Sequence, residues 1–580
     1  MNNTDSFRLN SFVLQSGFKR TYISSIDKID YSDGQVEDEI FTVLCDLEDC
    51  NVEKHEYLED QIKDWPTKYH FGWERQNILS TIKFDENDKV LELGAGTGVL
   101  TDFLVKNVEY VCSIEGTFSR GRCIEKRCFD STNFDVIIAN FLEVDLNSLF
   151  SNFKFDKILL IGVLEYIPKY SNLSSEEAIQ KILNTCNQLL SENGELIIAI
   201  ENKLGLKYLM GWDEDHNGQK FYSVESKYKT RNDFATFSKN EIEREIKKAN
   251  FQVVNFSYPF PDYKLPSLII NESENLKNKE FKELLKNLLY EIKVPNYDLK
   301  HTIHDLNQIK FGRVLSNIID EEILPSISNS FLIVAEKNPK QIKNNILAVY
   351  FSAQRRYKFA NKILFKSQFQ NMFIEKSWLY TDQDQGKNIL NLNCRKDIIQ
   401  DCVLGISLHV KFDNLYYIND EVAYKVLLNK WIQFLKTNLN GFEFTFDIVP
   451  FNAILSENDI ITMIDVDEWE MGKKLSIAQL LYRYFILNKE HLVWLYPNII
   501  GFENKMLELL EDYQINLINI SEFHEIDILH HYSQIAIMRK PYSTSLISPT
   551  AKEITLKQTV KLVLKKTYAV FKRRVYKILK

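Results

Sequence analysis

The stretch "KVLELGAGTGVLTDFL", residues 89–104, decides the fold predicted for this chain. It begins with an apolar run at 89–93 that is typical of a buried strand, and it continues into a helix. Gly94, Gly96 and Gly98 separate the two. Glycines in such a turn let the backbone approach a ligand closely, and the amide groups at the helix start point toward that ligand. The stretch therefore predicts a strand–turn–helix unit with a binding site at its turn.

An acidic residue ends the next predicted strand. Residues 109–115 form an apolar run whose last residue is Glu115. A carboxylate in this position can bind the ribose hydroxyls of a nucleoside. A dinucleotide-dependent oxidoreductase more usually carries G-x-G-x-x-G, whereas this turn reads G-x-G-x-G and follows Glu92. An ordinary tight turn without a ligand is the alternative interpretation.

Apolar runs alternate with amphipathic segments beyond the glycine turn. One predicted helix, 174–190, opens with Ser174 and has Glu177 three residues later, the spacing of a capping box. Strands that alternate with helices of this length indicate a parallel sheet, so we expect an α/β, Rossmann-like fold. The expected sheet is seven-stranded, with a helical insertion at about 270–328 before its last strand: 89–93, 109–115, 134–139, 155–162, 194–201, 251–258 and 330–337.

The glycine turn resembles motif I of class I S-adenosylmethionine (SAM) methyltransferases, which implies SAM as the cofactor. In that family Glu92 would lie near the methionine moiety and Glu115 would bind the ribose. Asn140 and Phe141, after the third strand, would face the adenine.

Four further segments are similar to those of methyltransferases found with bacterial surface-polysaccharide enzymes. By this resemblance Tyr69, His70 and Arg75 would close over SAM, and the arginine is suited to the SAM carboxylate. A packed helix start without a binding role is the alternative. The segments are "DWPTKYHFGWERQNIL" (64–79), "GVLEYIP" (162–168), "AIENKLGLKYLMGWDEDHNG" (199–218) and "YPFPDYKLPS" (258–267).

The polar segment "GWDEDHNG", residues 211–218, is expected on the acceptor side. Methyl transfer is a direct displacement that depends on holding donor and acceptor in line. A hydroxyl acceptor benefits from a base such as Asp215 or His216, whereas a phosphate oxygen needs no base and prefers cations. The sequence does not choose between them, and a solvated loop without a catalytic role is the third possibility.

The pattern of alternating strands and helices ends near residue 340. We place a boundary there between a methyltransferase domain (1–340) and a second domain (341–540). The second domain begins with three closely spaced strand-like runs and continues with a helix. These runs are 346–352, 356–365 and 371–378, and the helix is 421–437.

The spacing of Asp447, Asn452 and Asp465 is that of a kinase catalytic loop and its metal-binding aspartate. In that pattern Asp447 orients the attacking hydroxyl, while Asn452 and Asp465 hold Mg²⁺ against ATP. Lys376, in the third strand-like run, is the best candidate for the ATP lysine.

The order of a methyltransferase followed by a protein-kinase-like α+β domain is similar to the dual kinase–methyltransferases that cap polymannose O antigens. The pattern departs from a kinase at Thr445, where a histidine is usual, and no glycine occurs between Gly312 and Gly386 to form a phosphate loop. A remnant fold that only binds nucleotide, or that serves as a scaffold, is the alternative.

A basic tail follows an acidic body. Residues 552–580 hold eight lysines and two arginines against one glutamate, which is +9, so the formal net charge of −9 leaves −18 on residues 1–551. Apolar residues recur at helical spacing in 554–580. We therefore expect 541–580 to form an amphipathic helix on an anionic membrane surface. A solvated or oligomerising helix is the alternative, and nucleic acid is disfavoured because the body is acidic.

Together these features predict a SAM-dependent methyltransferase that modifies or caps a bacterial surface polysaccharide or its lipid-linked precursor. It would act on a sugar hydroxyl or a phosphate, coupled to a kinase domain that phosphorylates the glycan. We expect a cytoplasmic protein on the inner face of the membrane, with glycosyltransferases of the same pathway as partners. A small-molecule or nucleic-acid methyltransferase and a non-catalytic adaptor are the rival classes.

Overall fold

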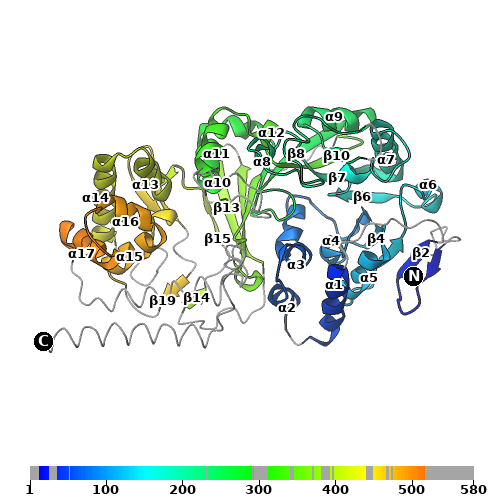
Figure 1. Ribbon diagram of the computed structural model, residues 1–580, viewed down its shortest axis with the longest axis horizontal. Coiled ribbons are helices and arrows are strands. Elements are labelled where there is room, and N and C mark those ends of the chain that lie inside the picture. The colour runs from blue at the N-terminus through cyan, green and yellow to red at the C-terminus, as the bar shows by residue number, and fades with distance from the viewer. Residues whose placement is uncertain are drawn as a thin grey trace.

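One large sheet organises most of the chain (Figure 1). Among the residues that the structure describes it has fourteen strands, in the order β1-β2-β5-β4-β3-β6-β7-β10-β8-β9-β11-β12-β13-β15. The computed structural model describes residues 12–24, 35–50, 52–229, 233–290, 292, 311–339, 345–353, 355–368, 371–379, 392–394, 398–438, 448–464, 469–471 and 475–515.

The centre of the sheet is the predicted Rossmann-like core. Its strand order is β5-β4-β3-β6-β7-β10-β8, and β10, the last of these seven strands along the chain, inserts antiparallel between β7 and β8. The prediction of a seven-stranded methyltransferase sheet is confirmed for this core. The strands are β3 (Lys89–Leu93), β4 (Tyr110–Glu115), β5 (Phe134–Ile138), β6 (Phe155–Ile161), β7 (Leu190–Glu201), β8 (Val253–Phe260) and β10 (Ser330–Glu336).

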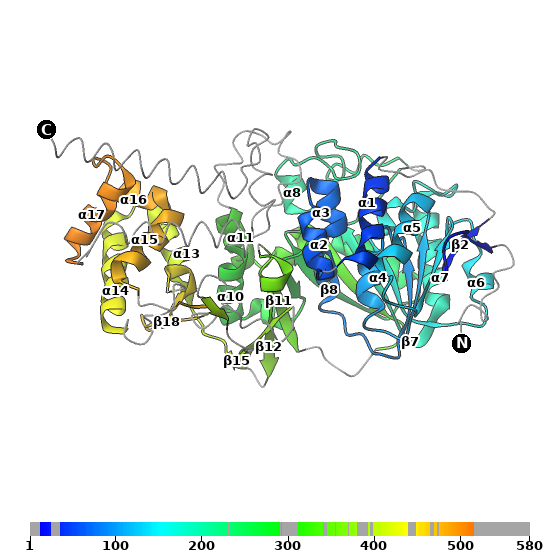
Figure 2. The ribbon, with the colours of Figure 1, turned by 90° about the horizontal axis from the view of Figure 1, so that it is seen from below.

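Side chains that alternate along the strands build an apolar core on each face. Val90 and Val111 pack with Leu100 and Leu104 on one face, whereas Leu91 belongs to the core of the other face. Helices cover both faces, as strands buried on both sides require (Figure 2). They are α4 (Val99–Leu104) and α5 (Phe118–Arg127) on the first face, and α7 (Ser175–Leu189) and α9 (Lys239–Lys248) on the second.

The predicted start of helix α7 is confirmed. The Ser174 hydroxyl accepts from the Glu177 backbone N–H, and the Glu177 carboxylate accepts from the backbone N–H of Ser174 at 3.0 Å. This reciprocal cap satisfies two backbone donors that a helix start leaves open.

The sheet continues past both edges of the core. A hairpin of β1 (Phe12–Leu14) and β2 (Thr21–Ser24) joins beside β5. At the other edge β9 pairs with β11, so strands before and after residue 340 share one sheet. The boundary near 340 stays a prediction. The added strands are β9 (Leu268–Asn271), β11 (Ile346–Phe351), β12 (Asn361–Gln368), β13 (Asn371–Trp378) and β15 (Ile398–Asp401).

Three helices of the segment 270–328 pack on the extended part of the sheet, and the bounds of the insertion stay a prediction. Its helices are α10 (Lys279–Tyr290), α11 (Phe311–Asp320) and α12 (Leu324–Ile327). Phe281 and Leu285 of α10 share an apolar core with Leu347 and Phe365 of the added strands. The expected strand at 356–365 is partly wrong, because Tyr357–Phe359 form a 3₁₀ turn and the strand begins at Asn361.

A separate helical group lies at the end of the molecule away from the methyltransferase core (Figure 1). Its own apolar core centres on the buried rings of Tyr424, Trp431 and Tyr484. Its elements are α13 (Leu408–Tyr417), α14 (Glu421–Asn438), α15 (Ile477–Leu487), α16 (Lys489–Leu495), α17 (Phe502–Asp512) and the strands β16 (Ile406–Ser407), β17 (Ala453–Leu455) and β18 (Ile461–Met463).

The remaining elements are short or lie before the core. They are α1 (Gln35–Cys45), α2 (Lys54–Asp60), α3 (Trp65–Phe71), α6 (Leu146–Leu149), α8 (Leu206–Leu209), and the paired strands β14 (Leu392–Cys394) and β19 (Trp469–Met471). Within the described part of the chain, no helix combines the length and the apolar character that crossing a membrane requires. The predicted tail, 541–580, lies outside the described residues.

Candidate active site at the carboxyl ends of the core strands

A cavity of about 450 Å³ opens where the core strands β3, β4, β5 and β6 end. Ligands of open α/β sheets bind at this edge, near the point where the strand order reverses. The cavity brings together eleven residues that the sequence singled out, whereas Gly98 lies just beyond it at the start of α4. The eleven are Tyr69, His70, Arg75, Glu92, Gly94, Gly96, Glu115, Asn140, Phe141, Asp215 and His216.

The turn after β3 requires glycine at each of its three positions. Gly94, Gly96 and Gly98 have φ angles of +74°, +57° and +81°, in the left-handed region that other residues rarely adopt. A Cβ at Gly94 would lie 2.6 Å from the Val163 side chain. A Cβ at Gly96 would meet nothing within 4 Å, so this backbone faces open space. The turn thus exposes main chain to the cavity.

Glu115 ends β4 with its carboxylate held against that turn. One oxygen accepts from the Gly96 N–H at 2.8 Å, and the other accepts from the Thr117 N–H at 3.2 Å. Burial is the largest influence on the carboxyl and raises its pKa. The carboxylate lies where a ribose ligand is expected, beside the amide groups of the turn.

Glu92 lies deeper than Glu115. Its carboxylate accepts from the hydroxyls of Thr101 at 2.6 Å and Ser113 at 3.1 Å. Burial raises the pKa of Glu92 from 4.5 to about 7. The carboxyl group therefore changes charge near neutral pH, and a cation next to it would favour the ionised form.

Helix α3 and the turn that follows it lie over the glycine turn. The His70 ring nitrogen Nδ1 lies 2.9 Å from the Thr97 hydroxyl, and Arg127 donates to the backbone carbonyls of both residues. The Arg75 guanidinium lies 4.8 Å from the centre of the Tyr69 ring. Arg75 also donates to the Tyr263 carbonyl at 3.2 Å. The arginine that is expected to bind the SAM carboxylate is therefore already held in place by the backbone near Tyr263.

The residues present fit SAM. Glu115 and the glycine turn offer an acceptor and open backbone to an adenosine, and Phe141 offers an apolar surface to its base. Arg75 can pair with the amino-acid carboxylate and Glu92 with the ammonium group. When bound, SAM supplies a methyl group on a positively charged sulfur, which an acidic cavity favours.

Asp215 and His216 belong to a buried charge network at the other end of the cavity. Asp215 accepts from Lys207 Nζ at 2.7 Å and also from Lys264 Nζ. Burial acts to raise the pKa of Asp215, but the two ammonium groups outweigh it and leave that pKa below its ordinary value. Asp215 is therefore a poor proton acceptor, and the expectation that it serves as a base is not supported by its surroundings.

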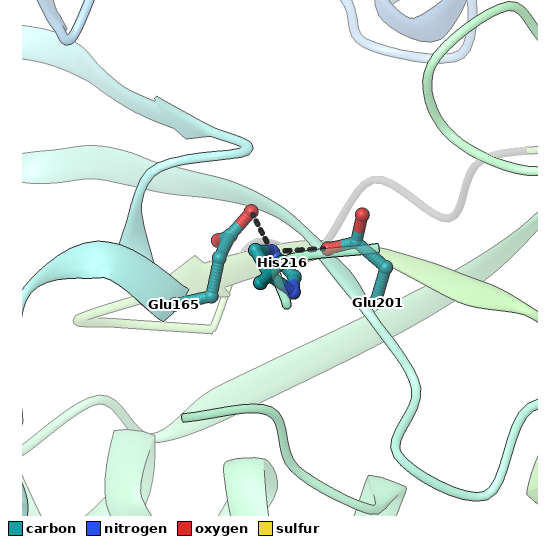
Figure 3. A group of neighbouring side chains, drawn as sticks. All are labelled: Glu165, Glu201 and His216. Atoms are coloured by element: carbon teal, nitrogen blue, oxygen red, sulfur yellow. Dashed lines mark ion pairs between the residues drawn. The ribbon is translucent and has the colours of Figure 1, made fainter. Parts of the chain in front are cut away.

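His216 lies among three carboxylates, and Figure 3 shows it between two of them, Glu165 and Glu201. Its Nδ1 is 2.8 Å from Glu214, and its Nε2 is 3.7 Å from both Glu165 and Glu201. Burial acts to lower the pKa of His216, but the carboxylates of Glu201, Glu165 and Glu214 raise it well above its ordinary value. A histidine in this setting holds a positive charge rather than acting as a free base.

The sequence did not predict a role for several residues of this acceptor end. Glu165, Glu201, Tyr263 and Lys264 lie inside segments that were singled out, yet no role was predicted for them. A signal was present for Glu201, because it ends core strand β7 as Glu115 ends β4. Arg120, which lines the cofactor end and pairs with Glu37 at 2.7 Å, carried no signal in the sequence.

Lys376 and Asn452, two of the residues proposed for a nucleotide, lie outside the cavity. Lys376 lies in β13 and is buried, and Asn452 ends a short turn before β17. The Asn452 carbonyl accepts from the Ile464 N–H at 2.7 Å, so the β17–β18 hairpin brings these two positions together. Asp447 and Asp465 lie outside the described residues.

The core sheet and its cavity define a class I SAM-dependent methyltransferase domain. A family model described as a methyltransferase domain matches residues 63–255, which include the glycine turn and most of the cavity. SAM is accordingly the cofactor of this domain.

Ribosomal RNA methyltransferases are similar to parts of this chain. The chain is 33% identical over 89 residues to ribosomal RNA small subunit methyltransferase A of Mycoplasma mycoides subsp. mycoides, which is 15% of this chain and 33% of that protein. It is 25% identical over 216 residues to the protein of the same name from Borreliella burgdorferi, which is 37% of this chain and 65% of that one. The chain thus spans less than two thirds of the length of either relative.

Solved structures of methyltransferases are similar in part. A SAM-dependent methyltransferase from Thermotoga maritima covers 52% of this chain and all of its own length (100%), with 13% identity and a TM-score of 0.28. The N-methyltransferase NodS from Bradyrhizobium japonicum, in complex with S-adenosyl-L-homocysteine, covers 50% of this chain and 100% of its own, with 10% identity and a TM-score of 0.26.

Proposed function

We propose that the protein uses SAM to methylate a hydroxyl group of a bacterial surface polysaccharide or of its lipid-linked precursor. The acidic wall at the acceptor end of the cavity carries this proposal. Five carboxylates lie in or directly behind this wall, against three cationic groups, among the residues that the structure describes: Glu165, Glu201, Glu214, Asp215 and Asp262 against Lys207, Lys264 and the protonated His216. Of these, Glu201, Asp215, His216 and Lys264 line the cavity itself. The excess of carboxylates in this network disfavours a phosphate, and the carboxylate oxygens can accept hydrogen bonds from sugar hydroxyls.

The proposal that the acceptor is a surface glycan is supported by the four segments that resemble methyltransferases of polysaccharide pathways. Three of them supply residues of the acceptor end: Glu165, then Glu201 with Asp215 and His216, then Lys264. The resemblance and the acidic wall therefore concern the same side of the cavity.

Mass spectrometry of the surface glycan, with and without this protein, tests the proposal. We expect a methyl ether that is present only with the protein, and its formation from labelled SAM by the purified chain. A methyl phosphodiester would contradict the hydroxyl acceptor. SAM binding without transfer to any glycan fraction would favour the non-catalytic adaptor.

RNA is the second candidate acceptor, because the relatives named above are ribosomal RNA methyltransferases. The acidic acceptor wall and the charge of −18 on residues 1–551 oppose a polyanion. Incubation of the purified chain with labelled SAM and either ribosomal RNA or the glycan decides between the two candidate acceptors. Label in RNA but not in glycan would overturn the glycan proposal.

The second domain is proposed to be kinase-like and to bind ATP with Mg²⁺ through Asp447, Asn452 and Asp465. Supporting it is the order of elements, in which helix α14 precedes the Asn452 turn and the β17–β18 hairpin leads to position 465. Asp465→Ala should abolish Mg²⁺-dependent ATP binding in calorimetry, because it removes a metal ligand. Absence of ATP binding by the wild-type chain at millimolar nucleotide would leave an architectural role.

The membrane partner also stays a proposal. A chain shortened after Pro549 should remain in the supernatant, whereas the full chain should sediment with anionic vesicles and be released by salt. Equal sedimentation of both forms would contradict a tail-mediated membrane contact. Glycosyltransferases of the same pathway are the protein partners that this location would bring close.

A further inference from the structure

Three donor side chains converge beside the acceptor end of the cavity. One ligand atom from each of Glu165, Glu201 and His216 lies within 4.8 Å of the other two (Figure 3). Both glutamates are fully buried (0% exposed), and the imidazole is only 2% exposed. They come from three separate elements: the 3₁₀ turn after β6, the end of β7 and the loop after α8.

The two glutamates have unused binding capacity. Oxygen Oε2 of Glu165 and Oε2 of Glu201 are buried, and neither has a hydrogen-bond partner within the described structure. The Nε2 atom of His216 lies 3.7 Å from one oxygen of each carboxylate, which is longer than a hydrogen bond. The other oxygen of each carboxylate has a partner, since Glu201 Oε1 accepts from Lys264 at 2.6 Å and Glu165 Oε1 accepts from the Tyr263 hydroxyl at 3.4 Å. A buried oxygen without a partner is costly, so the two Oε2 atoms leave room for a further cation in the cluster.

The orientation of His216 points to a metal ion as that charge. The other ring nitrogen, Nδ1, lies 2.8 Å from the Glu214 carboxylate, which in turn accepts from the backbone N–H of His216 at 2.8 Å. Metal-binding histidines nearly always donate their second ring N–H to such an acceptor. With Nδ1–H donating to Glu214, Nε2 faces Glu165 and Glu201, and a metal ion that displaces the Nε2 proton would meet its lone pair there.

We propose that Glu165, Glu201 and His216 bind one divalent transition-metal cation at the acceptor end of the cavity. Donor atoms bound to one ion at about 2.1 Å with tetrahedral angles lie roughly 3.4 Å apart. The two distances of 3.7 Å are close to this spacing, so small side-chain movements suffice. Mixed imidazole and carboxylate donors suit Mn²⁺ or Zn²⁺ and are too few for Ca²⁺.

Three protein ligands leave a coordination position open, as in catalytic metal sites. Glu201 and His216 line the same cavity as the glycine turn, so an acceptor hydroxyl could occupy that position. A metal-bound hydroxyl releases its proton to solvent more readily. The oxygen lone pair then forms the new bond to the methyl carbon, while the carbon–sulfur bond breaks and its electrons stay on sulfur. This role rests on the proposed function, whereas metal binding itself does not.

Titration of the full-length protein, stripped with a chelator, with Mn²⁺ alone tests the site. We expect one Mn²⁺ per chain in calorimetry and electron paramagnetic resonance. Glu201→Gln and His216→Asn should each lower the Mn²⁺ affinity at least about 100-fold, and Glu214→Gln should lower it about 10-fold to 100-fold. Glu225→Gln, an exposed carboxylate in the same stretch of chain, is the matched control and should bind like wild type.

SAM titration of each variant shows that the variant is folded. It also distinguishes failure of the metal site from failure of the proposed function. Absence of stoichiometric Mn²⁺ and Zn²⁺ binding to a wild-type chain that binds SAM would overturn the metal site. Equal metal affinity in wild type, Glu201→Gln and His216→Asn would also overturn it. Stoichiometric Mn²⁺ binding without any glycan methylation would support the site and contradict the proposed function instead.

Discussion

The two ends of the cavity are built in different ways. At the cofactor end, main-chain groups make the decisive contacts, as in the 2.8 Å hydrogen bond between the Gly96 N–H and Glu115. At the acceptor end, buried side-chain charges from distant segments neutralise one another, as in the contacts of Lys264 with Glu201 and Asp215. A main-chain site can stay the same across many methyltransferases, whereas a side-chain network can be altered to suit one acceptor.

The largest expected effect is on the acceptor end. Lys264 donates to Glu201 at 2.6 Å and also to Asp215, and its ammonium group is the closest cation to Glu201 among the described residues. Lys264→Met leaves the buried Glu201 carboxylate without its closest cation, while Lys207 still pairs with Asp215, and it should lower the free energy of unfolding by about 3–5 kcal/mol. Denaturant unfolding measures this loss.

Lys227→Met is the matched control, since Lys227 forms an exposed ion pair with Glu225. It should change the free energy of unfolding by less than about 1 kcal/mol. Equal effects of the two substitutions would show that the acceptor network is no more than a set of surface charges.

The next largest effect is expected on the pH dependence of the free energy of unfolding, through the carboxyl group of Glu92. Its pKa is raised from 4.5 to about 7 in the folded chain, so the folded state holds its proton more tightly than the unfolded state. Stability then falls as pH rises from about 4.5 to about 7 and stays lower above that range. Glu92→Gln should remove this loss, with a gain of up to about 3 kcal/mol at pH 8 and almost none at pH 4.

Thermal unfolding of wild type and Glu92→Gln across this pH range measures the difference. Saturating SAM should reduce it, because the cofactor ammonium group would favour the ionised carboxylate. A stability difference that is the same at pH 4 and pH 8 would contradict a raised pKa for Glu92.

The contrast between the two ends also explains what the sequence could predict. Gly94, Glu115 and Asn140 each end a core strand or follow one closely, so the apolar pattern alone is enough to assign them to one edge of the sheet. Lys264 and His216 both lie against Glu201, although they come from two separate segments of the chain that have no periodic pattern. Charge pairing decides their positions, and charge pairing is not visible in one sequence.

The same reasoning applies to the sheet. The seven core strands followed from alternating apolar runs, but β9 was not predicted. This short strand pairs with β8 on one side and β11 on the other, and it thereby joins the core to the strands beyond residue 340. Strand pairing between segments about eighty residues apart depends on backbone hydrogen bonds that any residue can form.

The smallest expected effect returns to the cofactor end. Thr97→Val removes the 2.9 Å contact between the threonine hydroxyl and His70 but leaves the main-chain turn intact. It should cost about 1 kcal/mol in the free energy of unfolding. SAM affinity should change only a few-fold. A loss of SAM binding in a folded Thr97→Val variant would mean that side chains, not main chain, build this end.

Calorimetric titration of the full-length chain with SAM tests the central claim most directly. Wild type should bind one SAM, and Glu115→Ala should weaken binding by about 1–3 kcal/mol through loss of a charge-assisted hydrogen bond. Gly96→Val, which places a side chain in the open space of the turn, should abolish it. Glu201→Gln, at the acceptor end, should leave SAM affinity within a few-fold of wild type. Unchanged affinity in both Glu115→Ala and Gly96→Val would contradict the assignment of the cavity to SAM.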